Sequence, residues 1–263
     1  MESLNASLSR SLLAGALLVA GAFAQSETKP PVAKQPVTKP QTKQGPAPQD
    51  RKQQRPATKE ALFRAFAAIK GLSADYTEDK YLSLLAVPLK SKGKLHFMQP
   101  GYLSRIVEAP EKSKLTITKS ELRMSAKDTT GKTKEEVIDL RQSDRVRLFV
   151  TSLVQVFQGN EKALEQHYQV RYTPKADDRH AWQLELQPRK KPLTQIMKKL
   201  VLAGSDKSVT RIELHEPNGD RTITKIVKVN ANRTFSSKEQ KEIFGVSAKP
   251  KTPPVKSKAG APR

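Results

Sequence analysis

The sequence predicts a mainly β protein with a few helices, an α+β fold in which one strongly curved antiparallel sheet wraps around helices. Over most of residues 72–229, apolar and polar side chains alternate in about ten short runs separated by turn signals, a pattern typical of strands. One segment before these runs and two in their middle have helical spacing instead. Because most of the strands follow one another directly, we expect neighbours to pair antiparallel.

The N-terminus predicts export. An apolar run over Leu12–Phe23 follows Arg10 and ends in Ala22-Phe23-Ala24, the small-x-small pattern that signal peptidase accepts. The run is too short to span a bilayer, so we expect a signal peptide over residues 1–24 that is cleaved after Ala24; a retained membrane anchor is the alternative. The chain has no cysteine, which excludes lipid attachment at this site, disulfides, thiol catalysis and thiolate metal sites.

Composition divides the exported chain into three parts. Residues 25–56 and 249–263 are rich in proline and lysine and hold almost no large apolar side chain. We therefore expect a disordered linker and a disordered basic tail around one ordered domain at residues 57–248. The chain carries 48 basic and 26 acidic residues, a net charge of +22, of which this domain holds +12. Such a surface favours phospholipid, lipopolysaccharide or polymer anions, and no nucleic acid is expected for an exported protein.

The ordered domain is predicted to open with a helix. Thr58 is a capping residue, and apolar side chains then recur at helical spacing up to Gly71. From Leu72 the period changes to two, which indicates a strand. The run Tyr81–Val87 is apolar at nearly every position and predicts a strand that is covered on both faces.

A β-hairpin is predicted over Gly93–Pro110. Leu95 and Phe97 alternate with polar neighbours before a Gln-Pro-Gly turn, and the alternation resumes through Leu103 and Arg105. Further strands are predicted at Leu115–Thr118, Glu121–Ser125 and Glu135–Leu140.

Two helices are predicted in the middle of the β pattern. Asp144–Phe157 has an apolar stripe that is wider than one side of a small sheet needs, and Gly159 ends it. A shorter helix is expected over Glu161–Tyr168. The wide stripe has two explanations: a wholly buried helix, or a helix lying over a concave sheet that is incompletely filled.

Strands return after these helices. They are predicted at Gln169–Thr173, Ala181–Gln187, Leu200–Ala203, Val209–Glu216 and Arg221–Val229. A helical turn is expected within Pro192–Lys199, and Pro217-Asn218-Gly219-Asp220 is a hairpin turn signal. Phe235, Phe244 and Val246 predict a short closing element.

No enzyme signature is present. The four histidines, His96, His167, His180 and His215, show no metal-ligand spacing, and His96 and His215 fall on the polar phases of their strands, where solvated side chains are expected. The sequence contains no nucleophile elbow, phosphate-binding glycine loop or H-E-x-x-H motif. We therefore predict a protein with no catalytic residue, no metal site and no cofactor.

Three motifs resemble a known family. The string G-x-L-x-F-x-x-P-x-x-L-x-R at Gly93–Arg105 resembles the second and third strands of the LolA family, periplasmic carriers of outer-membrane lipoproteins. W-x-L-x-L-x-P at Trp182–Pro188 and E-P-N-G-D-R-T at Glu216–Thr222 follow in the matching order. The resemblance covers roughly Leu62 to Val229, and the order and spacing of the motifs make it more specific than any one of them.

The resemblance implies an unclosed β-barrel with helices as its lid, a periplasmic location, and an apolar cavity that shields acyl chains. The implied partners are an acylated lipoprotein or other lipid cargo, an inner-membrane donor protein and an outer-membrane acceptor protein; an anionic membrane surface is compatible, and we expect a monomer. Candidate cavity residues are Leu95, Phe97, Leu103, Leu115, Ile117, Trp182, Leu184 and Leu186 on strands and Phe149, Leu153 and Phe157 on the long helix. Each of them could equally belong to a filled core.

One departure from the family pattern affects the expected function. Well-studied carriers resemble R-P-x-x-x-x-W at this hairpin, with the arginine as a lid latch, whereas this chain has Gln99-Pro100 followed by Arg105. Gln99 and Arg105 are the candidate mouth or lid contacts, with Arg105 either a compensating charge near the cavity mouth or a solvated surface residue. Another acylated molecule or a glycolipid is therefore open as cargo. The alternative function is a non-catalytic envelope binding or scaffold protein with a closed core and a basic surface.

Overall fold

The computed structural model describes residues 56–128 and 130–246, and this part of the chain forms one antiparallel sheet with helices. The strands are β1 (Gly71–Tyr81), β2 (Leu89–Met98), β3 (Tyr102–Ala109), β4 (Ser113–Ile117), β5 (Glu121–Lys127), β6 (Thr133–Asp139), β7 (Tyr168–Pro174), β8 (Ala181–Pro188), β9 (Lys199–Ser205), β10 (Ser208–His215) and β11 (Arg221–Asn230). The helices are α2 (Lys59–Ala67), α3 (Asp144–Phe157), α4 (Glu161–Glu165) and α5 (Ser237–Phe244), with a 3-10 turn η1 (Leu193–Gln195).

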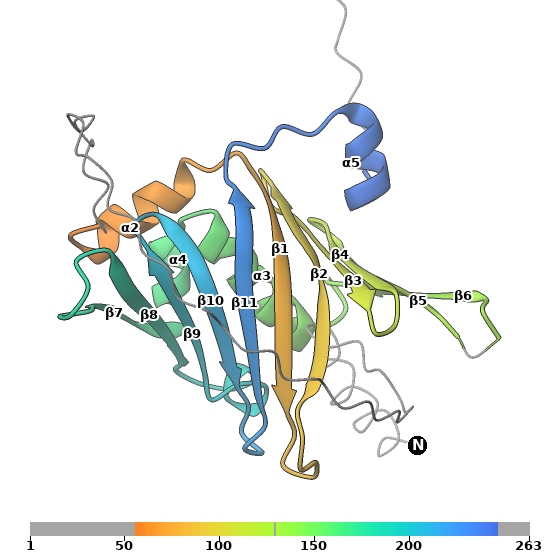
Figure 1. The fold of residues 1–263 in the computed structure, drawn as a ribbon, viewed down its shortest axis with the longest axis horizontal. Coiled ribbons are helices and arrows are strands. Elements are labelled where there is room, and N and C mark those ends of the chain that lie inside the picture. The colour runs from red at the N-terminus through yellow and green to blue at the C-terminus, as the bar shows by residue number, and fades with distance from the viewer. Residues whose placement is uncertain (1–55, 129, 247–263) are drawn as a thin grey trace, which may run out of the picture.

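The eleven strands lie in the order β6-β5-β4-β3-β2-β1-β11-β10-β9-β8-β7. Strands that are consecutive in the chain are therefore neighbours, except for β6 and β7. In addition, the first and last strands, β1 and β11, pair with each other in the middle of the sheet. The two outer strands, β6 and β7, do not pair, so the sheet curves without closing. The segment that joins them forms α3 and α4, which lie with α2 on one side of the sheet (Figure 1). This arrangement confirms the predicted fold class.

Local sequence explains where the helices begin. The side chains of Thr58 and Ser143 accept hydrogen bonds from backbone N–H groups in the first turns of α2 and α3. Such caps satisfy donors that have no partner within the helix. The predicted boundaries of α3 are confirmed at both ends. Its apolar stripe packs against the concave side of the sheet, and most of its members are buried.

Two predicted elements differ from the structure, and so does the number of strands. β1 ends at Tyr81, and the apolar run that follows it forms an exposed loop, not a covered strand: Leu84 is 95% exposed. An apolar run indicates only that its side chains are hydrophobic and does not identify a partner strand. In the sheet, no strand pairs with residues 82–87. α4 ends at Glu165, earlier than predicted, because β7 begins at Tyr168. The closing element is the helix α5, which packs on β3 and β4, and the sheet has one strand more than expected.

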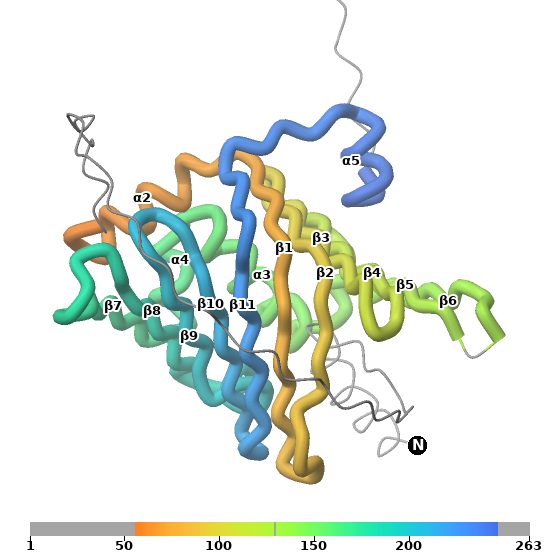
Figure 2. Tube along the Cα trace, viewed as in Figure 1, coloured from red at the N-terminus to blue at the C-terminus, as the bar shows by residue number. Residues whose placement is uncertain are grey.

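The β5–β6 hairpin projects away from the body of the domain (Figure 2). β6 is a largely exposed edge strand and its Val137 is 49% exposed. The predicted signal peptide at 1–24, the linker at 25–56 apart from Pro56, and the tail at 249–263 lie outside the described residues. Within the part of the chain that the structure describes, no helix has the length and apolar character needed to cross a bilayer.

Candidate ligand-binding cavity

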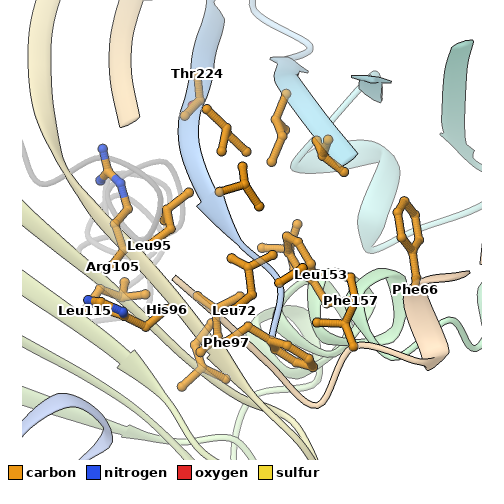
Figure 3. Close-up of a pocket in the computed structure, with 18 of the residues that line it drawn as sticks. Phe66, Leu72, Leu95, His96, Phe97, Arg105, Leu115, Leu153, Phe157 and Thr224 are labelled. Carbon is orange, nitrogen blue, oxygen red and sulfur yellow. The ribbon is translucent and has the colours of Figure 1, made fainter. Parts of the chain in front are cut away.

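A cavity lies between the concave face of the sheet and helix α3 (Figure 3). Its empty space, including the part open to solvent, is about 1160 Å³. Eighteen of the 23 lining residues are apolar. They are Phe66, Ile69, Leu72, Leu95, Phe97, Leu103, Leu115, Ile117, Leu122, Phe149, Val150, Leu153, Phe157, Val209, Ile212, Ile226, Val229 and Ala231. The polar lining residues are His96, Arg105, Lys207, Ser208 and Thr224.

Strand register aligns the apolar side chains on the sheet. Phe97 of β2 lies opposite Leu72 of β1 and Leu103 of β3, and Leu103 lies opposite Ile117 of β4. Residues that are directly opposite in antiparallel strands project from the same face. One row of large apolar side chains therefore crosses four strands, and it faces the helices.

Helix α3 supplies the opposite wall of the cavity. Phe149, Leu153 and Phe157 recur every four residues and so lie on one side of the helix. The Phe157 ring lies 5.6 Å from the Phe97 ring, centroid to centroid, which brings helix and sheet together at this point. Leu153 and Phe157 stay half-buried although they face the sheet. The helix therefore lies over a concave sheet that is incompletely filled, the second of the two explanations for its wide stripe.

The cavity has a polar end. Arg105 lines it together with Thr224, and Figure 3 shows Arg105 extending away from Phe97 and Phe157. Arg105 Nη2 lies 2.7 Å from Glu78 Oε1, and Thr224 Oγ1 donates a 2.9 Å hydrogen bond to Glu78 Oε2. Arg105 also lies 4.8 Å from the centroid of the Tyr76 ring, a cation–π distance.

The geometry of this polar end decides between the two alternatives for Arg105. The residue is 6% exposed, so it is not a solvated surface residue. Burial raises the pKa of Glu78, although the Arg105 guanidinium opposes that shift. Burial likewise raises the pKa of Tyr76 to about 12, so its hydroxyl is neutral. Arg105 and Glu78 form a buried ion pair at one end of a mainly apolar space.

Gln99 lies outside the cavity lining and contacts the end of a helix. Its Nε2 donates to the carbonyl oxygens of Ala67 and Ile69, both at 3.0 Å, at the C-terminal end of α2. The side chain of Gln158, just after α3, donates to the carbonyl oxygen of Pro100 in the same turn. The β2–β3 turn is therefore held to both helices at the position where the resemblance leads one to expect a latching arginine.

Eight of the eleven candidate cavity residues line the cavity, and three do not. Trp182, Leu184 and Leu186 of β8 are at most 1% exposed and belong to the packed core. They point to the predicted side of the sheet, but Phe66 of α2 covers that region, with its ring 6.0 Å from that of Trp182. Whether an inward-facing residue lines the cavity or belongs to the core depends on where its strand lies in the sheet. Period-two alternation within a strand does not reveal that position.

Several lining residues were missed by the sequence prediction. Val209 and Ile212 of β10 and Ile226 and Val229 of β11 form the other side of the cavity. Both strands were predicted with the correct boundaries to within one residue, and the pairing of first and last strands puts them beside β1. The alternation of apolar residues in β10 and β11 was the sequence signal that could have identified these positions. The sequence did not reveal the sheet order that brings the two strands close to β2 and β3.

The histidines do not form a reaction centre. His96 is half-buried, not solvated, with its ring 6.0 Å from Phe235 and its Nδ1 2.9 Å from Ser73 Oγ, and burial lowers its pKa. His215 is half-buried beside Glu213, and burial lowers its pKa too. In residues 56–128 and 130–246, no three His, Cys, Asp or Glu side chains gather as a metal site would need. The walls of the cavity offer mainly hydrocarbon surface.

The described residues thus form an unclosed, curved antiparallel sheet with an apolar cavity under a helical cover. A model of the family described as outer membrane lipoprotein carrier protein LolA-like matches residues 58–242. This chain belongs to that LolA-like family. The family is one of carriers and not of enzymes, in agreement with the prediction of no catalysis. No curated protein sequence matches the chain significantly.

The solved structures to which this chain is similar match it at low sequence identity and low TM-score. A LolA superfamily protein from Nitrosomonas europaea is 10% identical over 69% of this chain and 96% of its own, with a TM-score of 0.38. A DUF1329 family protein from Desulfovibrio piger is 11% identical over 68% and 92%, with a TM-score of 0.38. The complex of MucA and MucB from Pseudomonas aeruginosa gives 12% identity over 65% and 56%, with a TM-score of 0.36. Similarity this low transfers no ligand or partner to this chain.

Proposed function

We propose that this protein is a periplasmic carrier that shields the acyl chains of a lipoprotein or related lipid in the cavity under α3, for transfer towards the outer membrane. In this proposal the chain is exported by its N-terminal signal, which is cleaved after Ala24. It receives its cargo from an inner-membrane donor protein and delivers it to an outer-membrane acceptor protein.

The observation that carries the proposal is the half-buried apolar wall between sheet and helix. Leu153 and Phe157 on α3 and Leu95 and Leu103 on the sheet all face the same space and are incompletely covered. Each methylene that a ligand hides from water contributes about 0.8 kcal/mol. Roughly ten shielded methylenes would therefore supply about 8 kcal/mol, the free energy of micromolar binding. An acyl chain can thus be held without a specific polar contact.

A variant of Leu153 tests the proposal. We expect Leu153→Asp to lower the affinity for a fluorescent fatty-acid probe by about tenfold or more, because a carboxylate in the wall loses solvation when an acyl chain enters. Leu153→Trp should also reduce uptake, because the larger ring fills the space without adding charge. The matched control is Val137→Asp, which places the same charge on the exposed edge strand β6, outside the cavity.

Probe titration and circular dichroism are measured on each purified variant. The proposal requires loss of uptake in both Leu153 variants, with a native spectrum and uptake by Val137→Asp equal to that of the unchanged protein. Equal uptake by all four proteins, or no uptake by the unchanged protein, would contradict it.

A further inference from the structure

We propose that one end of the sheet binds an anionic membrane surface, with the β1–β2 loop inserted among the lipids and the β8–β9 loop against the headgroups. The apolar tip is residues 82–88, and the basic loop is residues 189–199. The inference concerns where the domain meets a bilayer and is independent of what the cavity holds. If the proposed function is correct, this contact would place the domain where cargo is exchanged.

The apolar tip exposes side chains that ordinary folding would bury. Leu84 is 95% exposed, Val87 71% and Leu85 44%, and Tyr81 at the end of β1 is 38% exposed. These four account for most of the large apolar side chains that are exposed in the described part of the chain. Scattered single exposed residues are common, whereas a cluster within seven positions marks a binding surface.

Hydrogen bonds hold the apolar tip in this exposed position. Leu85 N donates to the carbonyl oxygen of Leu82 at 3.0 Å, which forms a turn within the tip. The backbone N–H and the hydroxyl of Ser83 both donate to Asp220 Oδ1, at 2.8 and 3.0 Å, and so tie the tip to the β10–β11 turn. The Arg221 guanidinium lies 4.7 Å from the centroid of the Tyr81 ring. The tip is therefore a supported structure that presents its leucine outward.

The basic loop lies at the same end of the sheet. Register places Tyr81 of β1 opposite Arg221 of β11, Arg221 opposite His215 of β10, and His215 opposite Lys199 of β9. Strands lie about 4.8 Å apart, so three steps separate β1 from β9 by about 15 Å. Figure 1 shows both loops along the lower edge of the sheet. A flat bilayer surface can therefore contact them together.

Charge indicates which partner fits this end. The basic loop reads RKKPLTQIMKK, with five cationic residues and no acidic one. Lys190, Lys191 and Lys198 are exposed, and no carboxylate of the described residues lies within ion-pair distance of them. Two of the nearby acids are already engaged: Asp79 pairs with Lys90 at 2.8 Å, and Asp220 accepts from Ser83. A third, Glu216, is half-buried beside Lys80, and burial raises the pKa of its carboxyl group.

An apolar segment beside unpaired lysines is the arrangement that binds bilayer interfaces. The apolar side chains enter the acyl region, and the lysines attract anionic headgroups. A protein partner for the apolar tip alone would leave the lysines without a role. The observations therefore favour an anionic bilayer as the occupant.

Vesicle co-sedimentation of the full chain tests the inference. We expect binding to vesicles of phosphatidylcholine and phosphatidylglycerol, weaker binding to phosphatidylcholine alone, and a fall in binding as salt is raised. The double variant Leu84→Ser with Val87→Ser should lose about tenfold or more in vesicle affinity. Val137→Ser, at an exposed valine on β6, is the matched control and should bind like the unchanged protein. All these proteins carry the same basic termini, so a difference in vesicle binding between them is caused by the substitutions in the apolar tip.

Two further variants separate this inference from cargo loading. Leu84→Trp should show a blue shift of tryptophan emission with anionic vesicles, because the native Trp182 is buried and the new ring would enter the bilayer. Leu153→Asp, which changes the cavity and leaves the tip intact, should bind vesicles normally. Equal vesicle binding by the tip double variant and the unchanged protein, or no shift for Leu84→Trp, would overturn the inference, whatever the cavity binds.

Discussion

The buried ion pair between Arg105 and Glu78 defines the polar end of the cavity. Its two side chains are 7% and 3% exposed, and Ser91 and Thr224 complete the hydrogen bonds of the carboxylate. Such a pair is costly to desolvate and is maintained by the mutual fit of its partners. If one partner is removed, the remaining buried charge loses the ion pair that offsets its desolvation cost.

Arg105→Met is therefore expected to lower the free energy of unfolding by about 3–5 kcal/mol, because it leaves Glu78 buried without its cation. Urea unfolding followed by circular dichroism measures the change. The double variant Arg105→Met with Glu78→Gln should recover part of the loss, since no buried charge remains. A single variant as stable as the unchanged protein would show that the pair is not buried as described.

Predictions for single residues were correct where the local sequence pattern determines the position of a side chain. They failed where a residue far away in the sequence determines it. Alternation placed Leu95 and Phe97 on one face of their strand, the resemblance made them cavity candidates, and both line the cavity. Arg105 shares their phase, but its burial depends on Glu78 two strands away, which the sequence does not connect to it. Leu184 is fully buried in the core cluster and does not line the cavity, a difference that alternation along the strand does not reveal.

At the scale of elements, the turn between α3 and α4 couples the cavity cover to α2. Gly159 has φ of 68°, and a Cβ there would lie 2.2 Å from the Phe63 carbonyl oxygen and 2.6 Å from Ala67 N. A side chain at this position would therefore push the two helices apart, in addition to its backbone strain.

Gly159→Ala is expected to cost about 2 kcal/mol or more of unfolding free energy, from the left-handed backbone together with the steric contact. Gly245→Ala is the matched control, because its φ is 70° and no atom lies within 4 Å of the added Cβ. It should cost only the backbone term, about 1 kcal/mol. Thermal unfolding of both variants measures the difference, and equal losses would contradict the tight packing of α3 and α4 on α2.

Elements with a complete local signal were predicted well, and those without one were not. α3 has a serine cap, a periodic stripe and a terminal glycine, and its predicted ends agree with the structure. The loop after β1 has only apolar composition, which states nothing about the surface that will cover it. Its exposure follows from the sheet order, in which β2 and β11 already occupy both sides of β1.

At the scale of the whole molecule, the two edges of the sheet explain why a cavity exists. β6 and β7 remain apart, and α3 and α4 lie across the concave face between them, so side chains from the sheet and one helix must fill the interior. The residues at the β8 side fill it completely, whereas those between β2 and α3 do not. The sequence predicted the curved sheet and its helices, but apolar faces look the same whether they meet side chains or acyl chains.

Native mass spectrometry with lipid extraction, on the protein purified from the periplasm, decides whether the cavity carries a lipid. We expect a co-purifying acylated species whose mass separates a lipoprotein from a glycolipid, and which Leu153→Asp no longer retains. A mass equal to that of the unliganded chain, together with no uptake of a fluorescent fatty-acid probe, would contradict this expectation and would favour the envelope binding or scaffold protein.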